Sequence, residues 1–195
     1  MSYSRSLEIS LNAALRTADT RTICAAIGTA VRTSLNVSRL ADDVGVNRTT
    51  LNRSFRSERG GPGLDLTIKI LSALSIRLVV AFVRQPKISP RQFGRSRKSD
   101  VHRELRSNSR MVAQYLTRAF DTSQIAAIVA AFSDVLRAQE NVVELAEKTA
   151  RARSSLYRAF TPPRVPRLST AVSFLDALGL RLAAKPLSKT IVHRR

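Results

Sequence analysis

The chain of 195 residues contains an internal repeat, and this repeat restricts its fold more than any other feature of the sequence. Residues 11–55 align with residues 116–160 at an offset of 105, and about 15 of the 45 positions are identical. One residue is then lost from the following loop, and residues 62–78 align with residues 166–182 at an offset of 104. The alignment predicts two copies of one small unit of roughly 75 residues each.

Apolar residues recur at helical spacing in each copy. Ile23, Ile27 and Val31 lie on one side of an expected helix, and residues 128–136 repeat the pattern. Two short helices are expected next, at 37–44 and 48–55. A further amphipathic helix is expected in each copy, and the aromatic content of 5% without Trp also favours small helical units. The predicted fold class is therefore all-α.

The turn between the two short helices carries the residues that such a turn requires. Gly45 suits the left-handed residue that ends a helix, and Asn47 is a good N-cap for the next one. Two short helices across a tight glycine turn, within a small helical unit, predict a helix-turn-helix. The second copy has Ala150 in place of the glycine and Ala152 in place of the capping Asn, and we expect each change to cost about 1 kcal/mol.

The net charge of the chain points to a polyanionic partner. Lys and Arg number 33 against 14 Asp and Glu, which gives a formal charge of +19. Residues 84–110 carry about +7 and residues 184–195 about +4, so these two segments hold more than half of the excess. Double-stranded DNA is the simplest partner for this charge.

Composition and charge together divide the chain into four parts. The predicted parts are a helix-turn-helix domain at 7–83, a basic linker at 84–110, a second helix-turn-helix domain at 111–183 and a basic tail at 184–195. As a flexible coil, the linker of 27 residues would span about 29 Å. It is expected to act either as a solvated tether or as an arm that contacts phosphates.

Both copies resemble a known family. The segments QIAAIVAAFSDVLRA, VVELAEKTARARSSLYRAF and LSTAVSFLDALGLRL, and LADDVGVNRTTLNRSF in the first copy, are similar to addiction-module antidote proteins, a branch of the lambda-repressor-like (XRE-type) helix-turn-helix superfamily. The resemblance implies two lambda-repressor-like bundles in tandem, DNA binding through the second helix of each motif, and transcriptional repression. It also implies that some relatives neutralise a partner toxin.

In the first copy, the recognition helix is expected at 48–55, with Leu51 and Phe55 facing the core. Arginine can bind guanine, asparagine can pair with adenine, and the threonine methyl can meet thymine. Two loop arginines beyond the helix are better placed for phosphates. The candidate DNA-binding residues are Arg48, Thr49, Thr50, Asn52, Arg53, Arg56 and Arg59.

In the second copy, Leu156 and Phe160 take the core positions. The exposed set differs from that of the first copy, which predicts a different base preference. Its candidate DNA-binding residues are Arg151, Arg153, Ser154, Ser155, Tyr157, Arg158, Arg164 and Arg167. The competing hypothesis is that the second copy mediates dimerisation or binds another partner, which leaves the first copy as the only one that reads DNA.

The sequence thus predicts a sequence-specific DNA-binding regulator, most simply a repressor, that acts as a monomeric pseudo-dimer or a homodimer. The alternatives are an antitoxin that binds a toxin and autoregulates its operon, or an architectural protein that tolerates any sequence. The charge argues against a basic toxin, which it would repel.

Catalysis is not expected, because no nucleophile triad, phosphate-binding loop or paired carboxylates occur. Neither a cofactor nor a metal site is expected, since His102 and His193 lie 91 positions apart without ligand partners. Cys24 is the one cysteine and is expected to be a small core residue. The first ten residues lack the apolar segment of a signal peptide. The expected location is therefore the cytoplasm, in association with the nucleoid.

Overall fold

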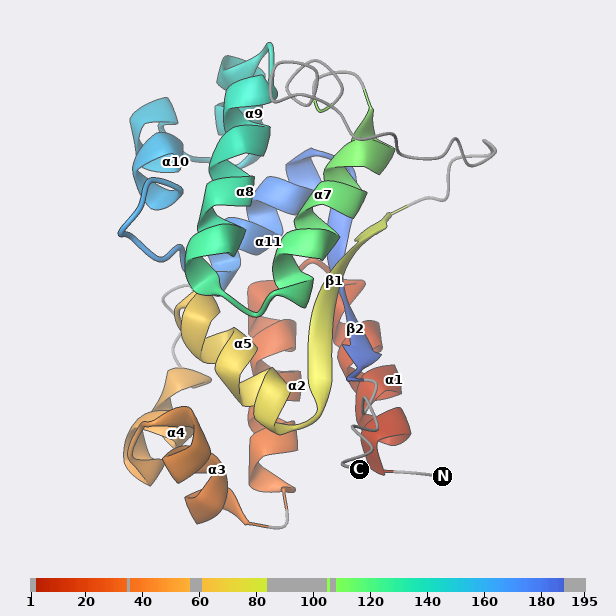
Figure 1. Ribbon diagram of the computed structural model, residues 1–195, viewed down its shortest axis with the longest axis vertical. Coiled ribbons are helices and arrows are strands. Elements are labelled where there is room, and N and C mark those ends of the chain that lie inside the picture. The colour runs from red at the N-terminus through yellow and green to blue at the C-terminus, as the bar shows by residue number, and fades with distance from the viewer. Residues whose placement is uncertain (1–2, 35, 57–60, 84–104, 106–107, 188–195) are drawn as a thin grey trace, which may run out of the picture.

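The computed structural model describes residues 3–34, 36–56, 61–83, 105 and 108–187. Within these ranges the chain is mostly helical, and the same order of elements occurs twice (Figure 1). The first copy contains α1 (Tyr3–Leu15), α2 (Thr20–Arg32), α3 (Val37–Val44), α4 (Arg48–Ser54), α5 (Leu64–Ala73) and β1 (Ile76–Phe82). The second copy contains α7 (Ser109–Asp121), α8 (Ile125–Ala138), α9 (Val142–Lys148), α10 (Arg153–Ala159), α11 (Leu168–Ala177) and β2 (Leu180–Pro186).

The turn between the short helices has the same backbone in both copies. Gly45 has φ +75° and Ala150 has φ +51°, so both residues adopt the left-handed conformation. The N–H of Val46 donates to the Ala41 carbonyl at 3.0 Å, and the N–H of Arg151 donates to the equivalent Ala146 carbonyl at 2.9 Å. The turn of the second copy therefore keeps its geometry without the glycine.

The caps that follow these turns differ. The Asn47 side chain accepts a hydrogen bond from the Thr50 N–H at 2.6 Å, which satisfies one of the free donors at the start of α4. Ala152 makes no side-chain cap hydrogen bond to α10. The cap is therefore missing, as the sequence predicts. The helix α10 nevertheless forms and spans Arg153–Ala159.

Each copy contributes one strand to a two-stranded antiparallel sheet. Ile76 pairs with Pro186 and Phe82 with Leu180, and Val79 and Ala183 face each other at the centre. A second, isolated bridge joins Gly63 to Arg167. The two copies are thus held together by backbone hydrogen bonds between segments about a hundred residues apart in the chain.

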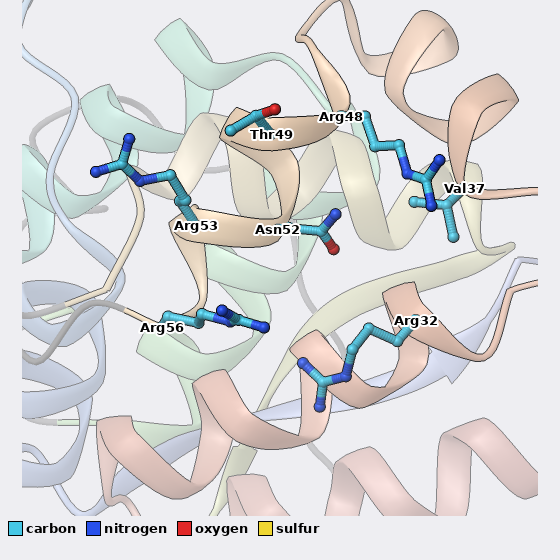
Figure 2. A pocket seen from close by; sticks show the side chains of 7 residues that line it. All are labelled: Arg32, Val37, Arg48, Thr49, Asn52, Arg53 and Arg56. Atoms are coloured by element: carbon cyan, nitrogen blue, oxygen red, sulfur yellow. The ribbon is translucent and has the colours of Figure 1, made fainter.

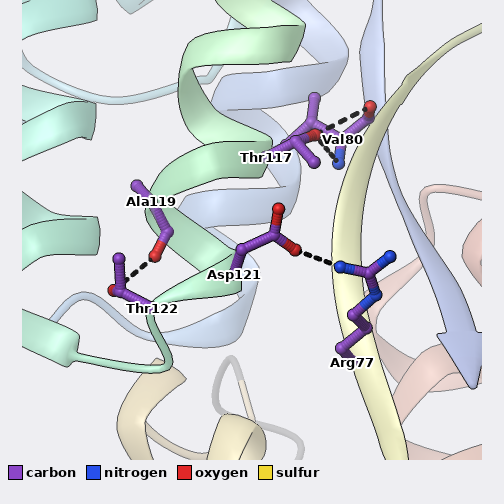
Figure 3. A network of polar contacts seen from close by, with 6 residues as sticks. All are labelled: Arg77, Val80, Thr117, Ala119, Asp121 and Thr122. Atoms are coloured by element: carbon purple, nitrogen blue, oxygen red, sulfur yellow. Dashed lines mark hydrogen bonds and ion pairs between the residues drawn. The ribbon is translucent and has the colours of Figure 1, made fainter. Parts of the chain in front are cut away.

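Each strand also packs against the first helix of the other copy: α7 lies along β1, and α1 lies along β2 (Figure 1). Thr117 of α7 binds both backbone groups of Val80, accepting from its N–H at 2.9 Å and donating to its carbonyl at 3.3 Å (Figure 3). Asn12 of α1 binds the N–H and the carbonyl of Ala184 in the same way, both at 2.9 Å. An Arg77–Asp121 ion pair adds to the α7 contact (Figure 3).

These contacts correct two expectations. The fold is mostly helical, as predicted, but it is not all-α, because the short apolar endings of the two copies form strands. The copies are not joined by a linker alone, since they share a sheet and exchange helix contacts. Most of the predicted linker lies outside the described residues, although α7 begins at Ser109, inside the range 84–110. Likewise β2 runs to Pro186, past the predicted start of the tail at 184.

Apolar side chains from both copies build a continuous core. Leu51, Leu156 and Phe160 are fully buried and Phe55 is 7% exposed, as the helix pattern predicts. Cys24 is buried, which confirms its expected place in the core, and this burial raises the pKa of its thiol. The second copy centres on Phe120, Phe132, Phe160 and Phe174, in which the rings of Phe132 and Phe160 stack at 5.0 Å. Among the described helices, none combines the length and apolar character needed to cross a bilayer.

Candidate nucleic-acid interface

The orientation of α4 is fixed by its buried side. Leu51 and Phe55 point into the core, which leaves the other side of the helix facing outward. At Gly28 of α2, an added Cβ would lie 3.2 Å from the Phe55 Cβ, so the glycine allows close approach of the α4 end to α2. The equivalent residue in the second copy is Ser133. This close packing in the first copy sets α4 beside the last turn of α2.

An open hollow of about 460 Å³ lies between α4 and the end of α2 (Figure 2). Four arginines supply its polar lining, and the amide of Asn52 lies between Arg48 and Arg56 (Figure 2). Val37 at the start of α3 adds an apolar wall. The full lining is Arg32, Val37, Arg48, Thr49, Asn52, Arg53 and Arg56.

The hollow has a strongly positive and uncompensated charge. Its four guanidinium groups are exposed, and no carboxylate in the described part of the chain forms an ion pair with any of them. The guanidinium of Arg32 donates to the Thr29 hydroxyl at 3.0 Å. Such a group of guanidinium donors suits phosphate oxygens and the O6 and N7 atoms of guanine.

Five of the seven residues predicted for the first copy line this hollow. Thr50 is exposed but does not line it, and Arg59 lies outside the described residues. Arg32 and Val37 were not predicted. This position is basic in both copies, since Arg137 is the equivalent of Arg32. Arg32 lies on α2, however, and only the fold brings it close to α4.

The second copy presents a different surface around α10. Arg153, Ser154 and Arg158 are exposed, Ser155 is partly buried, and Tyr157 keeps 37% of its surface exposed. Arg151 is partly buried, and its Nε is enclosed without a hydrogen-bond partner among the described residues. This environment follows from its alignment with the half-buried Val46 of the first copy.

The two predicted loop arginines of the second copy have different surroundings. Arg164 is exposed. Arg167 is also exposed, but it lies in the bridge to Gly63, and its Nη1 donates to the Gly61 carbonyl at 3.2 Å. The Arg167 guanidinium therefore already helps to hold the two copies together.

The second copy also has acidic residues near its short helices. Glu144 of α9 accepts from Lys148 at 2.6 Å, and this hydrogen bond, together with the charge of Lys148, lowers the pKa of the Glu144 carboxyl. The equivalent position in the first copy is Arg39, which is exposed. Because α3 carries Asp42 and Asp43 where α9 carries Glu147 and Lys148, the two helices have the same formal net charge and differ only in how it is arranged.

Comparison with known proteins bears on the second copy. Residues 95–186 match the model of a family described as "probable addiction module antidote protein". No curated protein and no solved structure matches the chain. The match covers just under half of the chain, from within the predicted linker to the end of β2, and it supports the antitoxin alternative better than a repressor without a toxin. The second half of the chain is thus similar to the antidote family.

Proposed function

We propose that the protein is an antidote of a toxin–antitoxin module that also binds the DNA of its own operon. The observation that carries the antidote function is the family match over residues 95–186. The hollow beside α4, with four arginines that no acidic side chain of the described ranges neutralises, supports the DNA-binding function.

The charge of the chain restricts the kind of toxin that it could neutralise. At +19, the protein would repel a basic toxin at long range. We therefore expect an acidic toxin that makes contact with the second copy. Exposed Val143 and Tyr157, on α9 and α10, supply apolar area for such a contact.

Co-expression tests the antidote function. The reading frame beside the gene of this protein is expressed alone and together with the full chain. Growth arrest by the neighbour alone, and its relief by this chain, is the expected result. A neighbour that does not inhibit growth, or whose effect persists in the presence of the chain, would contradict the proposal.

Salt-dependent DNA binding tests the second function. Arg53→Gln removes one charge from the hollow, and Lys69→Gln removes one from an exposed position of α5 that does not line it. The first variant should weaken binding and reduce the slope of log K against log salt by about one, whereas the second should change little. Equal losses for the two variants would mean that only overall charge matters.

A repressor without a toxin is the second candidate, and the basic hollow of the first copy favours it, because this copy lies outside the family match. The two candidates separate cleanly. Specific DNA binding together with an inactive neighbouring gene would favour the repressor.

A further inference from the structure

We infer that a single chain is the complete DNA-binding unit and that its target has two unlike half-sites, one for each copy. The inference rests on the proposed DNA-binding function. It adds the stoichiometry of the complex and the kind of site that is recognised. Three features of the described residues support it: the symmetry of the junction, the protection of the strand edges and the difference between the two outer surfaces.

The junction between the copies has the form of a symmetric dimer interface. Val79 faces Ala183, and these two residues are equivalent at the offset of 104. Gly63 faces Arg167, and these two residues are also equivalent to each other at the offset of 104. Contacts between equivalent residues occur on the axis of an isologous interface. An approximate two-fold axis therefore relates the two copies within one chain.

Hydrogen bonds away from the axis follow the same symmetry. The Leu64 N–H donates to the Pro166 carbonyl and the Leu168 N–H to the Pro62 carbonyl, each at 2.9 Å. At the ends of the sheet, Val83 donates to Gly179 at 3.1 Å and Leu187 donates to Ser75 at 2.8 Å. Each bond has its counterpart in the other copy, so the chain already contains both halves of a dimer interface.

Side chains of the packed helices occupy part of each outer edge of the sheet. Thr117 binds both outward backbone groups at Val80, and Asn12 binds both at Ala184. A helix that covers a strand edge in this way protects the edge against pairing with a strand from a second molecule. The sheet that joins the two copies therefore does not favour dimerisation with a second chain by strand pairing.

The two surfaces that the symmetry relates carry different chemistry. Asn52 of α4 corresponds to Tyr157 of α10, and Arg56 corresponds to Thr161. An amide pairs with adenine, whereas a phenol offers one hydroxyl and an apolar ring. Figure 1 shows α4 and α10 along the same side of the molecule, toward opposite ends. Two helices placed in this way suit successive major grooves, about 34 Å apart.

The experiment selects duplexes from a random DNA pool with the full chain and measures the mass of the complex on the best duplex. One chain for each duplex is the expected stoichiometry, with a motif of two unlike halves. Asn52→Ala should relax base preference about tenfold in one half only, and Tyr157→Ala in the other half only. The two variants are matched controls, because they change equivalent positions and both side chains are at least partly exposed. Unchanged unfolding midpoints confirm that both variants fold.

The outcomes distinguish the inference from the function beneath it. If a palindromic site is selected, or two chains occupy one duplex, the inference is wrong although DNA binding stands. If only Asn52→Ala alters the motif, the second copy does not read bases and the inference is also wrong. If the chain retains no duplex above background, the proposed DNA binding fails and the inference fails with it.

Discussion

A pair of reciprocal substitutions tests how the turn between the short helices is stabilised. Gly45 and Ala150 occupy equivalent left-handed positions, with φ of +75° and +51°. Ala150→Gly relieves the strain of the second turn, and Gly45→Ala introduces the same strain in the first. Because the positions are equivalent, each variant is the control for the other.

The expected magnitude follows from the surroundings of the two residues. A Cβ added at Gly45 would meet no atom within 4 Å, and Ala150 is exposed, so packing changes contribute little. A left-handed conformation costs a non-glycine residue about 1–2 kcal/mol. Glycine returns about 0.4–1 kcal/mol of this through its freer unfolded chain. Ala150→Gly should therefore stabilise the protein by about 0.5–1 kcal/mol, and Gly45→Ala should destabilise it by a similar amount.

Urea unfolding of both variants and the parent measures these differences from the transition midpoints at constant m-value. In thermal unfolding, a change of about 1 kcal/mol should move Tm by roughly 2–4 °C for a chain of this length. The reasoning is refuted if Ala150→Gly lowers stability, or if both substitutions shift it in the same direction. Either result would mean that contacts other than backbone strain decide these turns.

Three further outcomes test other parts of the fold. Ala152→Asn should supply the missing cap of α10 and add about 1 kcal/mol to the free energy of unfolding in urea, and no gain would mean that the cap site is not formed. Asn12→Ala leaves both backbone groups of Ala184 unpaired and should cost about 1–3 kcal/mol in the same assay, whereas an unaffected midpoint would mean that water replaces the side chain. Burial raises the pKa of Tyr115 to about 12, and its hydrogen bond to Asp134 adds to this effect. In the unfolded chain, Tyr115 loses its proton near pH 10. The stabilisation that comes from this difference in pKa should therefore be complete below about pH 10 and should be lost as the pH rises toward 12. In Tyr115→Phe, the urea midpoint should depend less on pH in this range.

Local features of the fold were predictable from the sequence. The apolar spacing placed Leu51, Phe55, Leu156 and Phe160 in the core, where the structure has them. The chemistry of the turn located the left-handed residue and the cap, and it also located the missing cap at Ala152. These features depend on residues within a few positions of one another, so a pattern in the sequence is enough to find them.

The sheet was not predictable by the same reasoning. Residues 76–82 form a short apolar run, and a run of this length fits a helix end or a strand equally well. Its partner lies about a hundred residues away, and only the pairing itself makes the segment a strand. The same limit applies to Arg32, because its place in the hollow depends on how α2 packs against α4.

The bridge between Gly63 and Arg167 has a consequence for how the two copies can vary. In a dimer of identical chains, a residue on the axis meets a second copy of itself and must be compatible with it. Two arginines in that place would bring like charges together, whereas here Arg167 meets a glycine and donates to the Gly61 carbonyl. In a dimer of the first copy, Arg77 would meet Arg16, the equivalent of Asp121, and these like charges would repel each other. Within one chain, the interface of each copy is complementary to that of the other copy. Neither interface would fit a second molecule of its own copy.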